Sequence, residues 1–82
     1  MPHLSVSGLT DRRLLSDIAM LVKNEHLTTT KVLVHLNEIE KRDLHLKLGC
    51  SSMFDYAVNH LDYSRSTAER RIQAARCIKR FP

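Results

Sequence analysis

Glycine and proline are scarce in this chain of 82 residues, which contains two of each. Both prolines lie near the ends, at positions 2 and 82, so the interior has almost no residue that breaks a helix. With only Gly8 and Gly49, the chain cannot build a glycine-rich phosphate loop of the Walker or dinucleotide-binding type. The shortage favours helices throughout and excludes two common classes of nucleotide site.

Long apolar runs are also missing. No run approaches the roughly 20 residues that span a bilayer, and the first four residues lack the basic start and apolar centre of a secretory signal. We therefore expect a cytoplasmic protein with no membrane partner. In that compartment Cys50 and Cys77 are expected to be reduced thiols rather than a disulfide.

Catalytic and metal-binding patterns are absent as well. The five histidines are dispersed, with no pair four residues apart and no Cys-x-x-Cys to hold zinc. Glu38 and Glu40 are two residues apart, which places them on different sides of a helix and makes them a poor acid-base pair. We expect no enzyme activity, cofactor, metal ion or small-molecule substrate.

The composition is that of a globular protein, with 43% hydrophobic and 27% charged residues. At this length there is room for one domain with a modest core. The prediction is a single all-α domain over residues 1–82, a compact bundle of four helices, with residues 1–8 as a flexible arm.

Apolar residues recur at helical spacing in four segments, each with a capping signal. The segments are residues 11–25, 29–48, 53–61 and 65–80, with a break at 26–30. Thr10 is the expected N-cap of the first segment, and Gly49 should end the second. Ser51 or Ser52 can cap the third, and Ser64 or Ser66 the fourth.

The positive charge is concentrated at one end of the chain. Residues 65–82 carry six basic residues and one acidic residue, a balance of +5, whereas residues 1–64 carry seven and eight, a balance of −1. A concentrated basic surface of this kind suits a polyanionic partner. The other interpretation is a solvated charged face.

Residues 53–80 match the outline of a helix-turn-helix, in which the second helix can lie in a DNA major groove. Asp62 stands where the turn usually has glycine, and Asp tolerates a left-handed conformation better than most residues. Arg71 takes a place that is often apolar, which Ile72 is expected to fill. Residues near the start of the last helix should approach base edges, and those near its end should meet phosphates. The residues expected to contact double-stranded DNA are Arg65, Ser66, Thr67, Glu69, Arg70, Gln73, Arg76, Lys79 and Arg80.

Residues 32–82 also resemble the region that precedes the catalytic domain in a group of bacterial HNH-endonuclease-like proteins. The matching positions are His35-Leu36, Glu38, Glu40, Arg42, Gly49, Ser51-Ser52-Met53-Phe54, Tyr56, Leu61, Ser64, Ala68, Arg71-Ile72, Ala74-Ala75-Arg76 and Phe81-Pro82. The resemblance implies a helical, DNA-associated module found beside nucleases. No HNH histidines and asparagine can be assigned in this chain, so cleavage is not carried over; the expectation is a freestanding relative, or a fragment without its catalytic part.

The competing hypothesis is a protein-interaction or dimerisation module, in which the first two helices make the contact and the arginines only increase solubility. Leu33, Leu44 and Leu46 do not all lie on one stripe, so the second predicted helix can be apolar on more than one side. A homodimer is compatible with both hypotheses.

Overall fold

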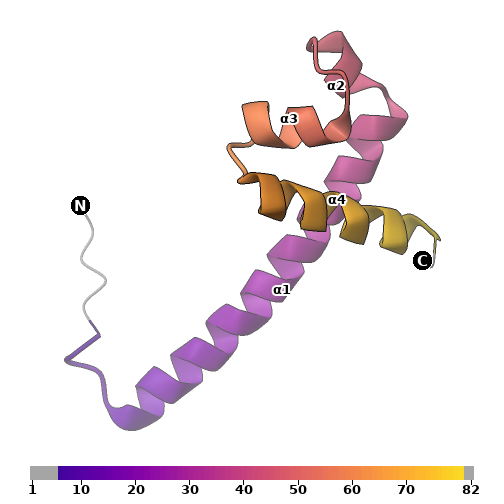
Figure 1. The fold of residues 1–82 in the computed structure, drawn as a ribbon. Helices are drawn as coiled ribbons and strands as arrows, with labels where there is room; N and C mark the ends of the chain where they lie inside the picture. Colours follow the sequence, from indigo (N-terminus) through magenta and orange to yellow (C-terminus); the bar gives the residue numbers. More distant parts are fainter. Residues whose placement is uncertain (1–5, 81–82) are drawn as a thin grey trace.

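The structure is a computed structural model that describes residues 6–80. All elements in this range are α-helices: α1 (Asp11–Lys41), α2 (Leu44–Lys47), α3 (Met53–His60) and α4 (Arg65–Arg80) (Figure 1). The all-α prediction is confirmed for this part of the chain. The first five residues of the predicted flexible arm, and the Phe81-Pro82 pair of the family resemblance, lie outside the described residues.

The predicted break at residues 26–30 is wrong, because α1 runs through it as one helix of 31 residues. Thr28, Thr29 and Thr30 have weak helix propensity, but no glycine or proline accompanies them. The Thr30 hydroxyl donates a hydrogen bond of 3.1 Å to the carbonyl oxygen of His26, four residues earlier. A threonine can therefore satisfy its side chain inside the helix, and the β-branched run does not end it.

The chain breaks later than predicted, within the segment that was expected to continue to residue 48. Helix α1 ends at Lys41, and Asp43 then adopts a left-handed conformation with a φ of 55°. After the short α2, Gly49 turns the chain with a φ of 86°, the role expected for it. Asp43 is thus a second stop that the apolar spacing did not indicate.

Three side chains cap the helices as the sequence predicted. The Thr10 hydroxyl accepts a hydrogen bond of 3.2 Å from the backbone N–H of Arg13 at the start of α1. Ser52 caps α3 by accepting from the N–H of Asp55 at 3.1 Å. Of the two serines proposed for α4, Ser64 is the cap, because its oxygen accepts from the N–H of Thr67 at 3.2 Å.

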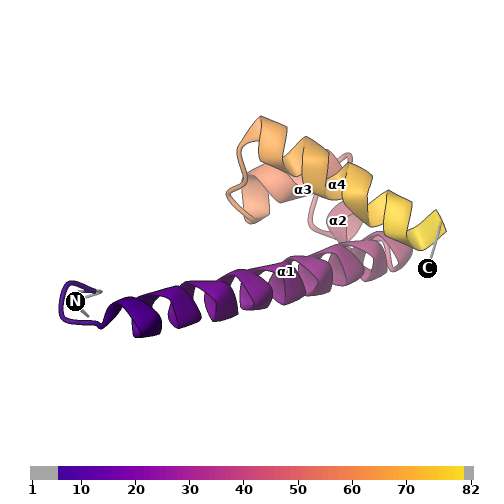
Figure 2. The ribbon, with the colours of Figure 1, turned by 90° about the horizontal axis from the view of Figure 1, so that it is seen from below.

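The core lies where α4 crosses the second half of α1 and packs beside α3 (Figures 1 and 2). Alanines on α3 and α4 allow the helices to approach closely. Asn37 on α1 donates a hydrogen bond of 2.9 Å to the carbonyl oxygen of Ala75, which fixes the crossing. We call residues 28–80 the lobe. Its buried apolar residues are Leu33, Leu36, Cys50, Met53, Ala57, Ala68, Ile72 and Ala75.

The first half of α1 extends away from the lobe (Figure 2). We call residues 11–27 the projecting segment; none of its residues is buried. The radius of gyration is 16.9 Å, against about 12 Å for a compact domain of this length. The described residues taken together therefore do not have the expected compact outline. No helix within residues 6–80 has both the length and the apolar character to cross a membrane.

Candidate nucleic-acid interface

The turn between α3 and α4 sets the direction of the basic helix. Asp62 has a φ of 57°, in the left-handed region that Asp enters more readily than most residues. The N–H of Tyr63 donates to the carbonyl oxygen of Ala57 at 3.2 Å, and Ser64 then caps α4. Asp62 thus supplies the left-handed residue of the turn between α3 and α4.

One side of α4 holds it in the lobe. Ala68, Ile72 and Ala75 recur at spacings of three and four residues and are all buried. Ile72 fills the apolar position as expected, and the neighbouring Arg71 is half-buried. Small alanines keep α4 close to α1 and α3, so its opposite side faces solvent.

Seven of the nine predicted contact residues lie together on that solvent-facing side. They are all exposed and fall within one broad sector at about 100° per residue. We call this sector the basic face. Its members from the predicted set are Arg65, Ser66, Glu69, Arg70, Gln73, Arg76 and Arg80.

The remaining two predicted residues lie elsewhere. Thr67 is half-buried, and its hydroxyl accepts hydrogen bonds from Ser64 at 2.9 Å and from Arg70 at 3.3 Å. Lys79 follows Ile72 and Ala75 on the core-facing side, and is exposed because it lies near the end of α4. Thr67 and Lys79 are therefore predicted contacts that lie outside the basic face, because helical periodicity puts them on other sides of α4.

Few carboxylates lie close to the arginines of the basic face. Within residues 6–80, no carboxylate lies within 4.0 Å of Arg65, Arg70 or Arg80. Arg76 is the exception, with its Nη2 atom 3.5 Å from an oxygen of Glu40. Both side chains are partly exposed, so this pair contributes little to stability, and it lowers the net charge of the face at one position only.

Two polar residues of α1 that contact α4 were not identified from the sequence. Asn37 binds the backbone of α4, and Glu40 pairs with Arg76. Both continue the buried stripe, because they follow Leu33 and Leu36 by four residues each. A polar residue on an otherwise apolar stripe was the available signal.

The structure also brings the start of α3 beside the basic face. A shallow depression of about 310 Å³ lies between them. Its lining residues are Ser52, Met53, Phe54, Glu69, Ile72, Gln73 and Arg76. The start of α3 therefore borders the basic face.

The cysteine and histidine side chains of residues 6–80 do not form a metal site. Among residues 6–80, no three His, Cys, Asp or Glu side chains are grouped as a metal site would require. Cys50 is buried and Cys77 is exposed, and the two thiols are not joined. His45 is buried in the lobe, and its Nδ1 atom has no hydrogen-bond partner among the described residues.

No family model, curated protein or solved structure matches this chain. The resemblance to the HNH-endonuclease-like proteins therefore stays a prediction.

Proposed function

We propose that this protein binds double-stranded DNA non-covalently through the basic face of α4, with α3 and α4 acting as a helix-turn-helix-like unit. The observation that carries the proposal is the solvent exposure of Arg65, Arg70 and Arg80 on one side of α4, without a carboxylate partner in the described chain. Guanidinium groups in that setting retain their charge and their hydrogen-bond donors for phosphates and base edges.

The two ends of the basic face suit different contacts. In a helix-turn-helix the residues near the start of the second helix approach base edges. Arg70 can bond guanine, and Gln73 adenine, through two hydrogen bonds each. Arg76 and Arg80 lie one to two turns further along and are assigned to phosphates, which add affinity and salt dependence rather than sequence choice.

The acidic member of the face also has an assigned role. Glu69 repels phosphates, but a carboxylate can accept a hydrogen bond from the amino group of cytosine. We assign Glu69 to a base edge for this reason. The biological role that fits is that of a regulator, or of the module that directs a nuclease to DNA.

Fluorescence anisotropy with a labelled duplex tests the proposal. Binding is expected at micromolar protein, and the logarithm of the binding constant should fall linearly with the logarithm of the salt concentration. Arg80→Gln should make that slope shallower by about 0.9, the value expected for one phosphate contact. Lys23→Gln removes the same charge from the projecting segment and should leave the slope unchanged. Absence of binding at micromolar protein, or equal effects of the two variants, would overturn the proposal.

The interaction hypothesis is the second candidate, and the exposed apolar side chains of α1 favour it. The leucines that the sequence suggested for this contact need revision. Leu33 is buried in the core, Leu44 is half-buried and only Leu46 is well exposed. Leu33→Glu would therefore unfold the lobe rather than probe a contact. If binding to DNA fails while a contact through the projecting segment is found, this candidate replaces the first.

A further inference from the structure

Helix α1 repeats its apolar pattern after 18 residues, which is five turns of an α-helix. Two residues that are 18 positions apart lie on the same side of the helix. The four positions of the projecting segment that correspond in this way to the core-facing residues Val32, Leu33, Leu36 and Ile39 are Leu14, Leu15, Ile18 and Leu21. The two halves of α1 therefore carry an apolar stripe on the same side, with the polar residues Glu25, Thr28 and Thr29 between them.

Only one half of the stripe is covered. Leu33 and Leu36 are buried under α3 and α4, with Val32 and Ile39 packed against them. The corresponding side chains in the projecting segment remain in solvent. Their exposed fractions are 42% for Leu14, 68% for Leu15, 52% for Ile18 and 61% for Leu21. Apolar side chains aligned in this way are typical of an interaction surface.

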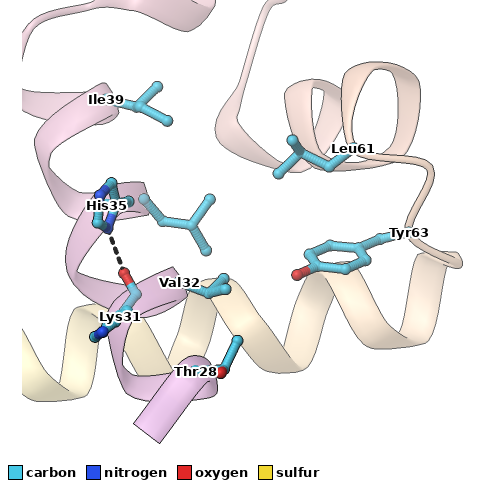
Figure 3. Close-up of a pocket in the computed structure, with 8 residues that line it drawn as sticks. Thr28, Lys31, Val32, His35, Ile39, Leu61 and Tyr63 are labelled. Atoms are coloured by element: carbon cyan, nitrogen blue, oxygen red, sulfur yellow. Dashed lines mark hydrogen bonds between the residues drawn. The ribbon is translucent and has the colours of Figure 1, made fainter. Parts of the chain in front are cut away.

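An apolar groove lies where the stripe reaches the lobe. Its volume is about 400 Å³, and it opens between α1 and the residues that follow α3 (Figure 3). Val32 on α1 faces Leu61 and Tyr63 across it, with Thr28 at the end nearest the projecting segment. The groove extends the uncovered stripe into the lobe.

We propose that a second copy of this chain covers the stripe, with the projecting segments of the two copies packed antiparallel about a two-fold axis near Ile18 and Ala19. In a two-fold pair each subunit contributes the same surface to the contact. A single apolar stripe on one side of a helix can provide such a surface. Leu14 of one copy then lies near the level of Val22 of the other.

The charges of the projecting segment favour a copy of the chain over other partners. Residues 11–25 contain three basic residues, Arg12, Arg13 and Lys23, and three acidic residues, Asp11, Asp17 and Glu25. The segment is neutral, so two copies can approach without net repulsion. A helix that lies on a membrane surface usually carries a basic polar face, which this balance does not provide. The same neutrality gives it no attraction for DNA.

Two sets of charges favour the antiparallel orientation: those of the lobes, which lie outside the contact, and those of the projecting segments, which lie within it. A parallel pair would bring two lobes, each with its basic face, to the same end and would place Glu25 beside Glu25. The antiparallel pair separates the lobes and brings Glu25 of one copy level with Arg12 of the other, while Arg13 is paired with Asp17 of its own helix. It also brings Leu9, which is 36% exposed, level with the open end of the groove at Thr28.

The size of the contact sets its strength. A standard stable interface takes about 800 Å² and 20 to 30 residues from each partner. The projecting segment has 17 residues, and only part of its circumference faces the partner. The pair is therefore expected to be weaker than a standard interface and to dissociate on dilution into the low micromolar range.

Sedimentation equilibrium without DNA tests the contact independently of the proposed function. From about 5 to 500 μM, the mass is expected to rise from one chain towards two. Ile18→Glu should weaken the association at least about tenfold, because it places a charge in the apolar contact. Met20→Glu is the matched control, since Met20 is 60% exposed on the opposite side of α1, and it should associate like the unmodified chain. A single-chain mass at all concentrations, or equal effects of the two variants, would overturn the proposal.

A distance measurement tests the orientation. Cys77 is exposed and Cys50 is buried, so a spin label can be attached at Cys77 of the folded chain. Electron paramagnetic resonance on the associated protein should give a label separation greater than the length of the paired segments, roughly 25 Å at 1.5 Å per residue. A shorter separation would show that the lobes lie at the same end and would contradict the antiparallel arrangement.

Discussion

The projecting segment and the lobe differ in what covers them, although α1 carries the same apolar stripe through both. In the lobe the stripe is buried by α3 and α4, with Leu36 only 3% exposed. In the projecting segment the corresponding residue, Ile18, is 52% exposed. Helical periodicity specifies which side of a helix is apolar, and the rest of the chain decides how much of that side becomes core.

The comparison also separates two kinds of exposed surface. The projecting segment presents apolar side chains with no net charge, whereas α4 presents guanidinium groups from a helix that is anchored by Ala68, Ile72 and Ala75. An anchored helix can hold charged groups in place for a partner. The stability of the isolated chain is therefore expected to reside in the lobe, and the following predictions test that difference.

The largest expected effect comes from truncating the stripe within the lobe. Leu36→Ala should lower the free energy of unfolding by about 2 to 5 kcal/mol, because it removes buried methyl groups and leaves a cavity. Ile18→Ala, at the corresponding position of the projecting segment, should cost under about 1 kcal/mol at concentrations where the chain is a monomer. Urea denaturation followed by circular dichroism measures both.

Leu36→Met keeps most of the volume and should cost less than about 1.5 kcal/mol. It shows whether the site can be probed without losing the fold. Equal costs for Leu36→Ala and Ile18→Ala would mean that the two halves of the stripe contribute equally, and the comparison would fail.

A smaller effect is expected at the cap of α4. Ser64→Ala should destabilise the lobe by about 1 kcal/mol, since the N–H of Thr67 loses its acceptor. Ser66→Ala is the matched control, because no backbone N–H at the start of α4 depends on the Ser66 hydroxyl in the described hydrogen bonds. Thermal unfolding should separate the two variants, and identical midpoints would argue against Ser64 as the cap.

The smallest effect concerns pH at the end of α1 in the lobe. The pKa of Glu38 lies below its usual value, chiefly because the Arg42 side chain donates a hydrogen bond of 2.7 Å to the carboxylate. A depressed pKa means that the pair stabilises the folded state above the unfolded pKa of Glu, about 4.3, and that this contribution is lost as the pH falls through the folded pKa. The pair is solvent-exposed, so the change in stability should be slight.

An NMR titration of the Glu38 side chain measures this shift directly. Arg42→Gln should raise the pKa of Glu38 towards its usual value, whereas Arg13→Gln, in the projecting segment, should leave it unchanged. A Glu38 pKa that does not respond to Arg42→Gln would exclude the hydrogen bond as the cause.

Features set by neighbouring residues could be predicted from the sequence. Ser52 and Ser64 cap the helices that follow them, Gly49 turns the chain with a positive φ, and Ile72 is buried as its spacing indicates. These features depend on hydrogen bonds and side-chain directions within about one helical turn. The helical segments of the lobe could be predicted from these local features, but the end of α1 just before Asp43 could not.

Features set by distant residues could not be predicted in the same way. Nothing local distinguishes Ile18 from Leu36, and the difference in burial arises because α3 and α4 reach only one of them. The contact of Glu40 with Arg76 joins residues 36 positions apart and was likewise hidden. The break predicted at residues 26–30 was wrong for another reason. The weak helix propensity of the threonines at 28–30 was outweighed by the helical residues on both sides of them.

The candidate interface was predictable in part. The concentration of charge after residue 64 and the exposure of Arg65, Arg70 and Arg80 follow from composition and periodicity. The hydrogen bonds that the Thr67 hydroxyl accepts from Ser64 and Arg70 could not be predicted from the sequence.

The most direct test of the central claim is an NMR titration of isotopically labelled protein with a short DNA duplex at moderate salt. The account predicts that the shifted backbone amides cluster along α4 and the start of α3, with Arg65, Arg70 and Gln73 among the largest changes. The amide resonances of the projecting segment should not shift. Shifts confined to the projecting segment, or no shifts at all with duplex in excess, would contradict the claim that the basic face of α4 binds DNA.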